Sequence, residues 1–241
     1  MIKEALEYIV GLGEAKEHTI YGDVYSDKQL HLVKPYFPMA KAIEMHTLTS
    51  LVDYIKAQVD EMPEHMIIDV RSPEQVALYS QLNSEHEREE FVVVNARIPA
   101  FPFNQFMDQE KFNINLQAKF LSDPETDKEL ILKFAGTVES GTVEQYGDDG
   151  VTQKATIKTG IASKADAVVP NPVSLRPYRT FLEVAQPKSD FIFRMKQDKY
   201  DGIAIAIFEA DGGAWQIEAT KSIKEYLEFE LADYPKFTII S

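Results

Sequence analysis

Apolar residues recur at helical spacing in two stretches near the N-terminus. They predict a helix over residues 2–10, which Gly11 and Gly13 end. They also predict a second helix, which begins after the N-cap residue Thr47 and ends before Pro63. The apolar face of this second helix consists of Leu48, Leu51, Val52, Ile55 and Val59. The stretch between the two helices is poorly periodic, which indicates an irregular connector.

The next part of the chain has shorter apolar runs, which are typical of β-strands. We predict a strand over residues 65–71, a turn at 72–73, and either a second strand or a short helix over 74–81. A charged loop over 84–90 precedes a buried strand over 91–98, where β-branched residues cluster.

Apolar residues recur at helical spacing again between residues 104 and 135. It predicts one helix over residues 104–121 and another over 126–135. The apolar face of the first of these helices consists of Phe106, Phe112, Leu116 and Phe120.

From residue 136 on, the pattern changes to alternation and turn residues. Gly-Asp-Asp-Gly at 147–150 separates the alternating stretches 141–146 and 151–159, which indicates a β-hairpin. Two further strands, joined by a charged turn, are expected over 191–195 and 203–208.

The C-terminal residues predict a turn at 211–213, a last helix, and a terminal strand over 237–240. The face of this helix consists of Ile217, Thr220, Ile223, Leu227 and Leu231.

This order of elements predicts an α+β fold: a mainly antiparallel sheet with amphipathic helices packed on it. We expect a helix-rich N-terminal half and a hairpin-rich C-terminal half within a single domain, residues 1–241. Within it, residues 1–45 form an irregular helix and arm, 46–135 the helix-rich half, and 136–241 the strand-rich half.

Charge is unevenly distributed along the chain, which carries −14 overall. Residues 151–200 hold nine basic and four acidic residues, a net charge of +5, so the remaining 191 residues carry −19. The nine basic residues are Lys154, Lys158, Lys164, Arg176, Arg179, Lys188, Arg194, Lys196 and Lys199. The overall charge argues against general coating of DNA, because phosphates repel such a protein.

The sequence lacks several features that carry chemistry elsewhere. It has no cysteine, which excludes disulfides, zinc–thiolate sites and a cysteine nucleophile. It has no Walker, GxGxxG or GxSxG pattern, and its five histidines are scattered. The N-terminus has no apolar signal core, and no apolar run is long enough to span a membrane. We therefore expect a cytoplasmic protein without a cofactor or a membrane partner.

Four carboxylates are candidate catalytic groups, because one lies at the end of a predicted strand with a second five residues on, and the other two lie at the end of another strand. Acids at strand ends are where two-metal phosphoryl enzymes keep their ligands. The four residues are Asp69, Glu74, Glu209 and Asp211. In the alternative interpretation, Asp211 simply belongs to a turn and Asp69 caps the segment that follows it.

A second candidate is a binding segment over residues 168–196, where basic and aromatic residues interleave. Arginine and aromatic side chains together can hold a single strand by charge pairing and base stacking. The candidate binding residues are Arg176, Tyr178, Arg179, Arg194 and Lys196, interleaved with Phe181, Phe191 and Phe193. In the alternative interpretation the aromatic rings are core, and the arginines pair with the surplus acids.

Three strings in the second half carry a family resemblance: DDGVTQKATIKTGIA at 148–162, VPNPVSLRPYRTFLEVAQPKSDFIFRM at 169–195, and FEADGGAWQIEA at 208–219. With MHTLTSLVDYI at 45–55, they resemble the YfdQ-like family of phage and prophage proteins of unknown function. The resemblance spans about residues 45–231. It implies a bacteriophage or prophage origin and a bacterial cytoplasm, and it implies no reaction or catalytic residue.

Three functions follow as hypotheses. The first is a non-enzymatic phage accessory protein of DNA metabolism, acting in replication or recombination and contacting single-stranded nucleic acid through residues 154–199. The second is an anti-defence or assembly protein that contacts a host or phage protein through its acidic surface. The third is a carboxylate–metal nuclease or hydrolase. A homo-oligomer is compatible with the first two.

Overall fold

The structure is a computed structural model of the whole chain. It describes residues 2–13, 15–20, 23–26, 28, 40–84, 86–137, 143–148, 153–159, 163–198 and 202–241. The chain divides into two compact units, Met1–Ala40 and Lys41–Ser241.

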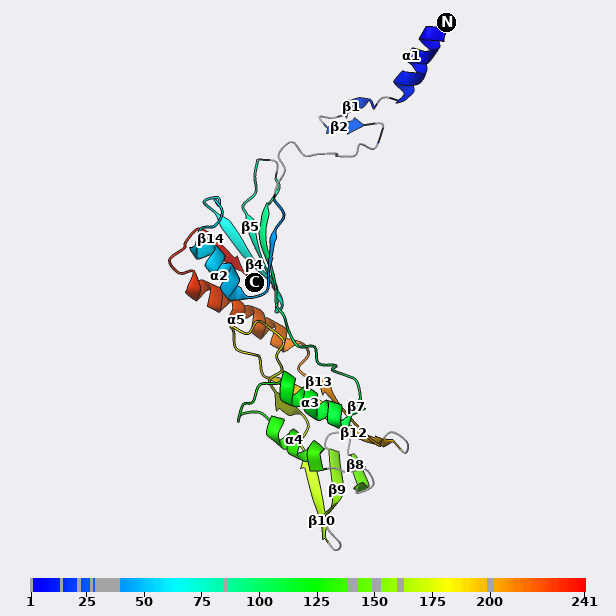
Figure 1. The fold of residues 1–241 in the computed structure, drawn as a ribbon, viewed down its shortest axis with the longest axis vertical. Coiled ribbons are helices and arrows are strands. Elements are labelled where there is room, and N and C mark those ends of the chain that lie inside the picture. Colours follow the sequence, from blue (N-terminus) through cyan, green and yellow to red (C-terminus); the bar gives the residue numbers. More distant parts are fainter. Residues whose placement is uncertain are drawn as a thin grey trace. The chain divides into compact units, whose positions relative to one another are not determined.

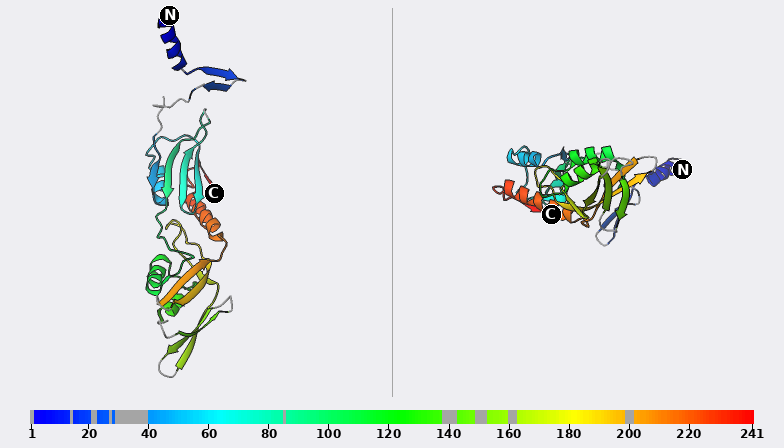
Figure 2. Two further views of the ribbon diagram at one scale, coloured as in Figure 1. Left: turned by 90° about the vertical axis from the view of Figure 1, so that its right-hand side faces the viewer. Right: turned by 90° about the horizontal axis from the view of Figure 1, so that it is seen from below.

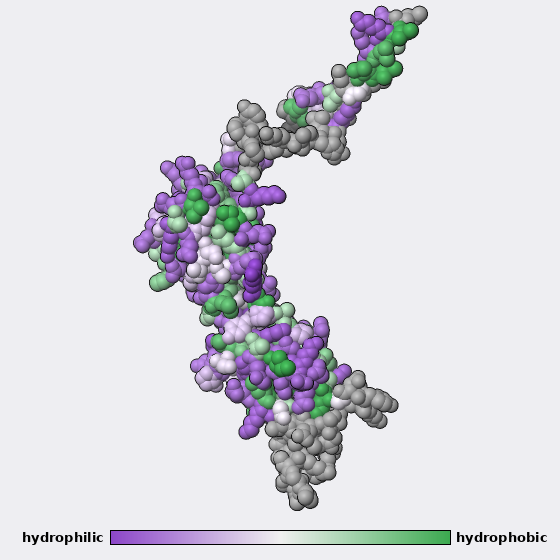
Figure 3. Space-filling view, in the orientation of Figure 1, coloured by the Kyte–Doolittle hydropathy of each residue, from purple (hydrophilic) through white to green (hydrophobic). Residues whose placement is uncertain are grey.

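The first unit holds a helix and a hairpin. Helix α1 (Ile2–Gly13) continues through the two glycines that were expected to end it, because glycine weakens a helix without forbidding it. Apolar side chains gather along one side of this helix (Figure 3). Strands β1 (Glu17–Ile20) and β2 (Asp23–Ser26) pair antiparallel within the stretch predicted to be irregular. The proline-rich part of that stretch lies outside the described residues.

The second unit contains a five-stranded mixed sheet (Figure 1), in the order β14–β4–β5–β6–β3. Its strands are β3 (Ile43–Met45), β4 (Met66–Ser72), β5 (Gln75–Ser80), β6 (Glu90–Asn95) and β14 (Phe237–Ile240). Strand β14 is parallel to β4 and β3 is parallel to β6, whereas β5 is antiparallel to both of its neighbours.

Helices α2 (Leu48–Lys56) and α5 (Ala214–Glu230) supply the apolar groups that cover this mixed sheet. The predicted N-cap is confirmed, since Oγ1 of Thr47 accepts a hydrogen bond from the backbone N–H of Ser50 at 3.1 Å. One core cluster joins the helices to alternate residues of the strands, as expected for a sheet with one buried face. Its members include Leu51, Ile55, Met66, Ile68, Val70, Leu78, Val92, Val94, Ile223 and Leu227.

A four-stranded antiparallel sheet, in the order β11–β12–β13–β7, has a core of its own. Its strands are β7 (Met107–Asp108), β11 (Val173–Leu175), β12 (Ser189–Asp198) and β13 (Gly202–Glu209). Helices α3 (Gln109–Lys119) and α4 (Lys128–Thr137) pack on it. Phenylalanine rings join the helices to the sheet: the ring of Phe193 meets that of Phe134 edge-on, with centroids 5.7 Å apart.

A three-stranded antiparallel sheet, in the order β10–β9–β8, lies between α4 and β11 in the sequence. Its strands are β8 (Val143–Asp148), β9 (Gln153–Thr159) and β10 (Ser163–Val169). The pairing of β8 with β9 confirms the predicted hairpin, and β10 extends it by one strand.

The connections between the mixed sheet and the four-stranded sheet matter most for the site. The chain builds most of the mixed sheet, leaves it after β6, and returns after β13 to form α5 and β14 (Figure 2). Residues 96–106 make the outward crossing and 210–213 the return. The loop over 176–188 also reaches back, since Phe181 and Val184 belong to the core of the mixed sheet. Three connectors therefore meet between the mixed sheet and the four-stranded sheet.

The predicted α+β class is confirmed, but the expected distribution of elements is not. In the part of the chain that the structure describes, seven strands, β1 to β7, come before α3, so strands are spread through the chain and the N-terminal half is not helix-rich. The sequence pattern missed β1, β2, β3 and β7, because strands of two to four residues are too short to show a period.

Helix ends account for most errors in the predicted apolar faces. Helix α2 ends at Lys56, so Val59 lies beyond it and is 63% exposed. Phe106 precedes α3 and is 40% exposed, and Ile217 is 75% exposed because α5 buries the face of Ala219, Ile223 and Leu227. Within the described residues, no helix is long and apolar enough to cross a membrane.

Candidate functional site

A pocket of about 380 Å³ lies where the three connectors meet. Ile98, Phe101 and Phe103 of the outward crossing form an apolar wall. Trp215, in the first turn of α5, provides a further aromatic surface. Glu74, Tyr178, Arg179 and Glu209 supply its polar groups. The pocket therefore combines aromatic surface with charge, as binding sites for small groups do.

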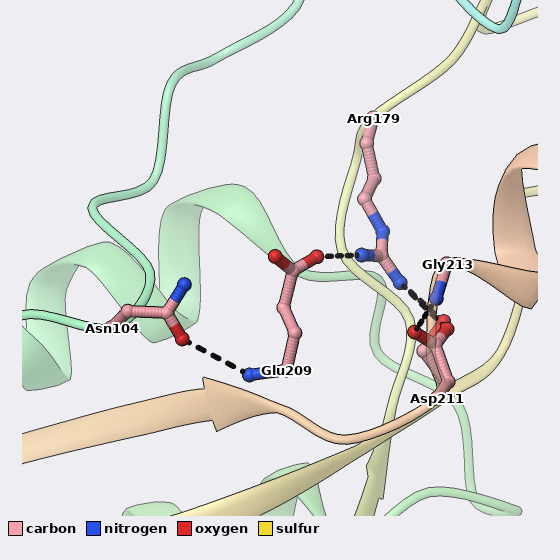
Figure 4. Close-up of polar contacts among 6 residues, drawn as sticks. Asn104, Arg179, Glu209, Asp211 and Gly213 are labelled. Atoms are coloured by element: carbon pink, nitrogen blue, oxygen red, sulfur yellow. Dashed lines mark hydrogen bonds and ion pairs between the residues drawn. The ribbon is translucent and has the colours of Figure 1, made fainter.

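Arg179 organises the charged side of this pocket (Figure 4). Its side chain is only 7% exposed. Its Nη1 donates a hydrogen bond to Oε1 of Glu209 at 2.8 Å. Its Nη2 donates to the hydroxyl of Ser189 and lies 4.0 Å from Oδ2 of Asp211. A buried guanidinium is thus held between two carboxylates.

Aromatic rings surround the same guanidinium. The Cζ atom of Arg179 lies 4.2 Å from the centroid of the Trp215 ring, 5.4 Å from that of Phe191 and 5.7 Å from that of Phe103. These distances are within the range of cation–π attraction, which strengthens when the cation is desolvated.

The pKa values of this cluster follow from burial and charge. Burial lowers the pKa of Arg179 to about 10, although the charges of Glu209 and Asp211 oppose the shift. Burial would raise the pKa of Asp211, but hydrogen bonds from Ser189 and from the backbone of Gly213, with the charge of Arg179, bring it below its ordinary value. Both residues are therefore charged at neutral pH.

The turn at 211–213 places Asp211 against Arg179. Gly212 and Gly213 have φ values of 63° and 83°, a left-handed conformation that side chains other than glycine adopt at a cost. The backbone N–H of Gly213 donates to Oδ1 of Asp211 at 3.0 Å, which fixes the carboxylate. The sequence predicted this turn, and the structure shows that it also positions a charge.

Replacing Asp211 with asparagine should lower stability at pH 7 by about 1 kcal/mol, because charge-assisted hydrogen bonds are lost. The lowered pKa means that the carboxylate stabilises the fold above its ordinary pKa of 3.8, and that this contribution is lost as the pH falls through the folded-state value. Urea midpoints of the wild type and Asp211→Asn should thus converge below about pH 3.8. The exposed Asp233→Asn variant is the control. A difference between the two urea midpoints that stays constant down to pH 2 would contradict this role of Asp211.

The predicted basic segment does not form one exposed face. Nε of Arg176 lies 3.0 Å from Oδ2 of Asp123, and Arg179 is buried. Arg194 and Lys196 lie on β12, where Nη1 of Arg194 donates to the carbonyl of Phe193 and Nζ of Lys196 lies 4.3 Å from the ring centroid of Phe106. Of the five candidate binding residues, Tyr178 and Arg179 are the two that line the pocket.

The aromatic residues interleaved with these cations are part of the core. Phe181, Phe191 and Phe193 are at most 2% exposed. This agrees with the alternative interpretation of the segment, in which rings are buried and arginines pair with acids. Three lysines of the basic region, Lys154, Lys158 and Lys164, lie on β9 and β10, where the side chains are outside the described residues.

The four candidate carboxylates separate into two places. Glu209 and Asp211 share the guanidinium of Arg179, and Glu74 lines the same pocket. Asp69 instead lies beside Arg71, with Oδ2 3.7 Å from the arginine Nε. Within the described residues, no group of three or more histidines and carboxylates is placed to hold a metal ion.

Sequence reasoning missed the aromatic half of the site. Trp215, Phe101 and Phe103 line the pocket, but none of them was a candidate. A signal was present, because Trp215 is the only tryptophan of the chain and lies two residues after the Asp-Gly-Gly turn. Ser189 has no comparable signal, since a lone serine at a strand start is common.

Comparison with protein-family models, curated proteins and solved structures finds no match to this chain.

Proposed function

We propose that this chain is a non-enzymatic accessory protein of a bacteriophage or prophage that acts by binding a positively charged protein partner. The charge around the pocket carries the proposal. One guanidinium, that of Arg179, accompanies three carboxylates, those of Glu74, Glu209 and Asp211, a net charge of −2. The whole chain carries −14. Both charges attract cations and repel phosphates.

The biological setting is part of the same proposal. The resemblance of residues 45–231 to the YfdQ-like family supports a phage or prophage origin and a bacterial cytoplasm. DNA replication, recombination, host defence and assembly all involve proteins whose lysines and arginines contact nucleic acid. Such basic surfaces complement an acidic protein, which supports action by protein–protein contact.

Direct contact with single-stranded nucleic acid has less support from the geometry. Such contact needs cations along the strand and exposed rings on which bases stack. Arg176 is paired with Asp123, and the rings of Phe191 and Phe193 are buried. The lysines of residues 151–200 nevertheless make it the competing outcome of the test.

Fluorescence anisotropy should separate the two partners. Three labelled probes are titrated with the full chain at low and at physiological salt: a lysine- and arginine-rich 12-residue peptide, a glutamate-rich peptide of equal length, and a single-stranded oligonucleotide. We expect the basic peptide to bind, more weakly at higher salt, and the two anionic probes not to bind.

Either of two binding results would overturn the proposal. Oligonucleotide binding that weakens steeply with salt would establish a phosphate-binding surface and overturn the proposal. Absence of binding to the basic peptide at low salt would also overturn it.

A further inference from the structure

We infer that the pocket at the meeting of the three connectors binds the guanidinium of an arginine side chain presented by the partner protein. The inference rests on the proposed function and adds the residue type that is recognised. A cation that is also planar suits this pocket, because the pocket offers carboxylate oxygens beside aromatic rings.

Two carboxylates have oxygens that Arg179 does not use. The carboxylate of Glu74 makes no hydrogen bond or ion pair with any residue that the structure describes, and this residue is exposed at the pocket. One oxygen of Glu209 bonds to Arg179, and the other points away from it (Figure 4). An incoming guanidinium has five N–H donors in a planar fork, which suits such acceptors better than the single point charge of a lysine.

Arg179 itself shows that these surroundings accept a guanidinium. Its side chain lies against Trp215, Phe103 and Phe191. A second guanidinium at the pocket has Phe101 and Tyr178 as further aromatic neighbours. Repulsion by Arg179 is offset, because Glu209 and Asp211 already neutralise its charge.

One donor of the Arg179 guanidinium lacks an acceptor in the described part of the chain. Nε of Arg179 is buried and has no hydrogen-bond partner among the described residues. A buried donor without an acceptor is unfavourable. The pocket volume of about 380 Å³ is sufficient for one arginine side chain.

Trp215 makes the inference directly measurable, since it is the only tryptophan of the chain and lines the pocket. The full chain is titrated with N-acetyl-arginine amide, with the lysine equivalent, and with the citrulline equivalent, which is neutral and nearly isosteric with arginine. We expect a saturable change in Trp215 fluorescence with the arginine compound, weaker binding of the lysine compound, and no binding of the citrulline compound.

Two variants test the location. Glu74→Gln should weaken binding of the arginine compound about fivefold, the value of one partly exposed ion pair. Glu218→Gln, an exposed residue of α5, removes the same charge elsewhere and should leave binding unchanged. Ala100→Phe should fill the pocket without changing charge and weaken binding about tenfold or more.

The contradicting outcomes are distinct from failure of the proposed function. Equal binding of the citrulline compound, or equal affinity of Glu74→Gln and wild type, would overturn the arginine site. Binding of the basic 12-residue peptide without any response to the arginine compound would overturn the pocket but leave the proposed function in place. If neither probe binds, both are overturned.

Discussion

Replacing Arg179 with methionine should destabilise the protein by about 3–5 kcal/mol, the cost of removing one partner from a buried ion pair. The change leaves the carboxylates of Glu209 and Asp211 beside the pocket without their cation. Methionine keeps much of the apolar volume among the rings, so the loss comes from charge rather than from a cavity. Urea unfolding followed by far-UV circular dichroism measures it without relying on Trp215, whose emission the substitution itself alters.

Two further variants identify the cause. The exposed residue Lys188 is on the same loop, and Lys188→Met should change stability by no more than about 0.5 kcal/mol. Adding Glu209→Gln and Asp211→Asn to Arg179→Met should restore about half of the lost stability, because the unpaired charges disappear. If the triple variant is less stable than Arg179→Met alone, packing rather than charge explains the effect.

Replacing Phe181 with alanine should cost about 3–5 kcal/mol, as expected for a fully buried aromatic side chain. Phe181 is 2% exposed and belongs to the core of the mixed sheet, although its loop starts and ends in the four-stranded sheet. The preceding residue also holds the loop against the mixed sheet, since Oγ1 of Thr180 donates to the carbonyl of Pro73 at 2.6 Å. The substitution therefore removes apolar burial and also a contact that joins the four-stranded sheet to the mixed sheet. A thermal or urea melt of the full chain measures the loss.

The adjacent residue provides a matched control. Leu182 is 69% exposed, so Leu182→Ala should shift stability by no more than about 0.5 kcal/mol. A similar small effect of both variants would show that the 176–188 loop does not join the mixed sheet to the four-stranded sheet in solution.

Local patterns identified the longer elements correctly. The helix after Thr47, the strands around Ile68 and Val92, and the hairpin of β8 and β9 were all predicted, because their spacing and turn chemistry are encoded within a few residues. Short strands such as β3 and β7 were missed, since pairing with a distant strand, rather than their own composition, makes them strands.

The candidate site was less predictable for the same reason. The sequence singled out Arg179, Glu209, Asp211 and Glu74 as charged residues worth attention, but assigned them to two different sites. The structure brings them together, because β13 ends beside the loop that carries Arg179. Lys128 shows the same limit: it looks like a surface lysine, yet it is 4% exposed and its Nζ donates to the carbonyl of Phe120 at 2.6 Å.

The sequence by itself determined the α+β class, the absence of cysteine chemistry, the surplus of acid and the turn at 211–213. These properties depend on composition or on neighbouring residues. Only the tertiary structure decided that the rings of the 168–196 segment are core, that Arg179 is a buried partner of two acids, and that a pocket lies beside them. Burial and charge pairing depend on which distant segments meet, and no local pattern carries that information.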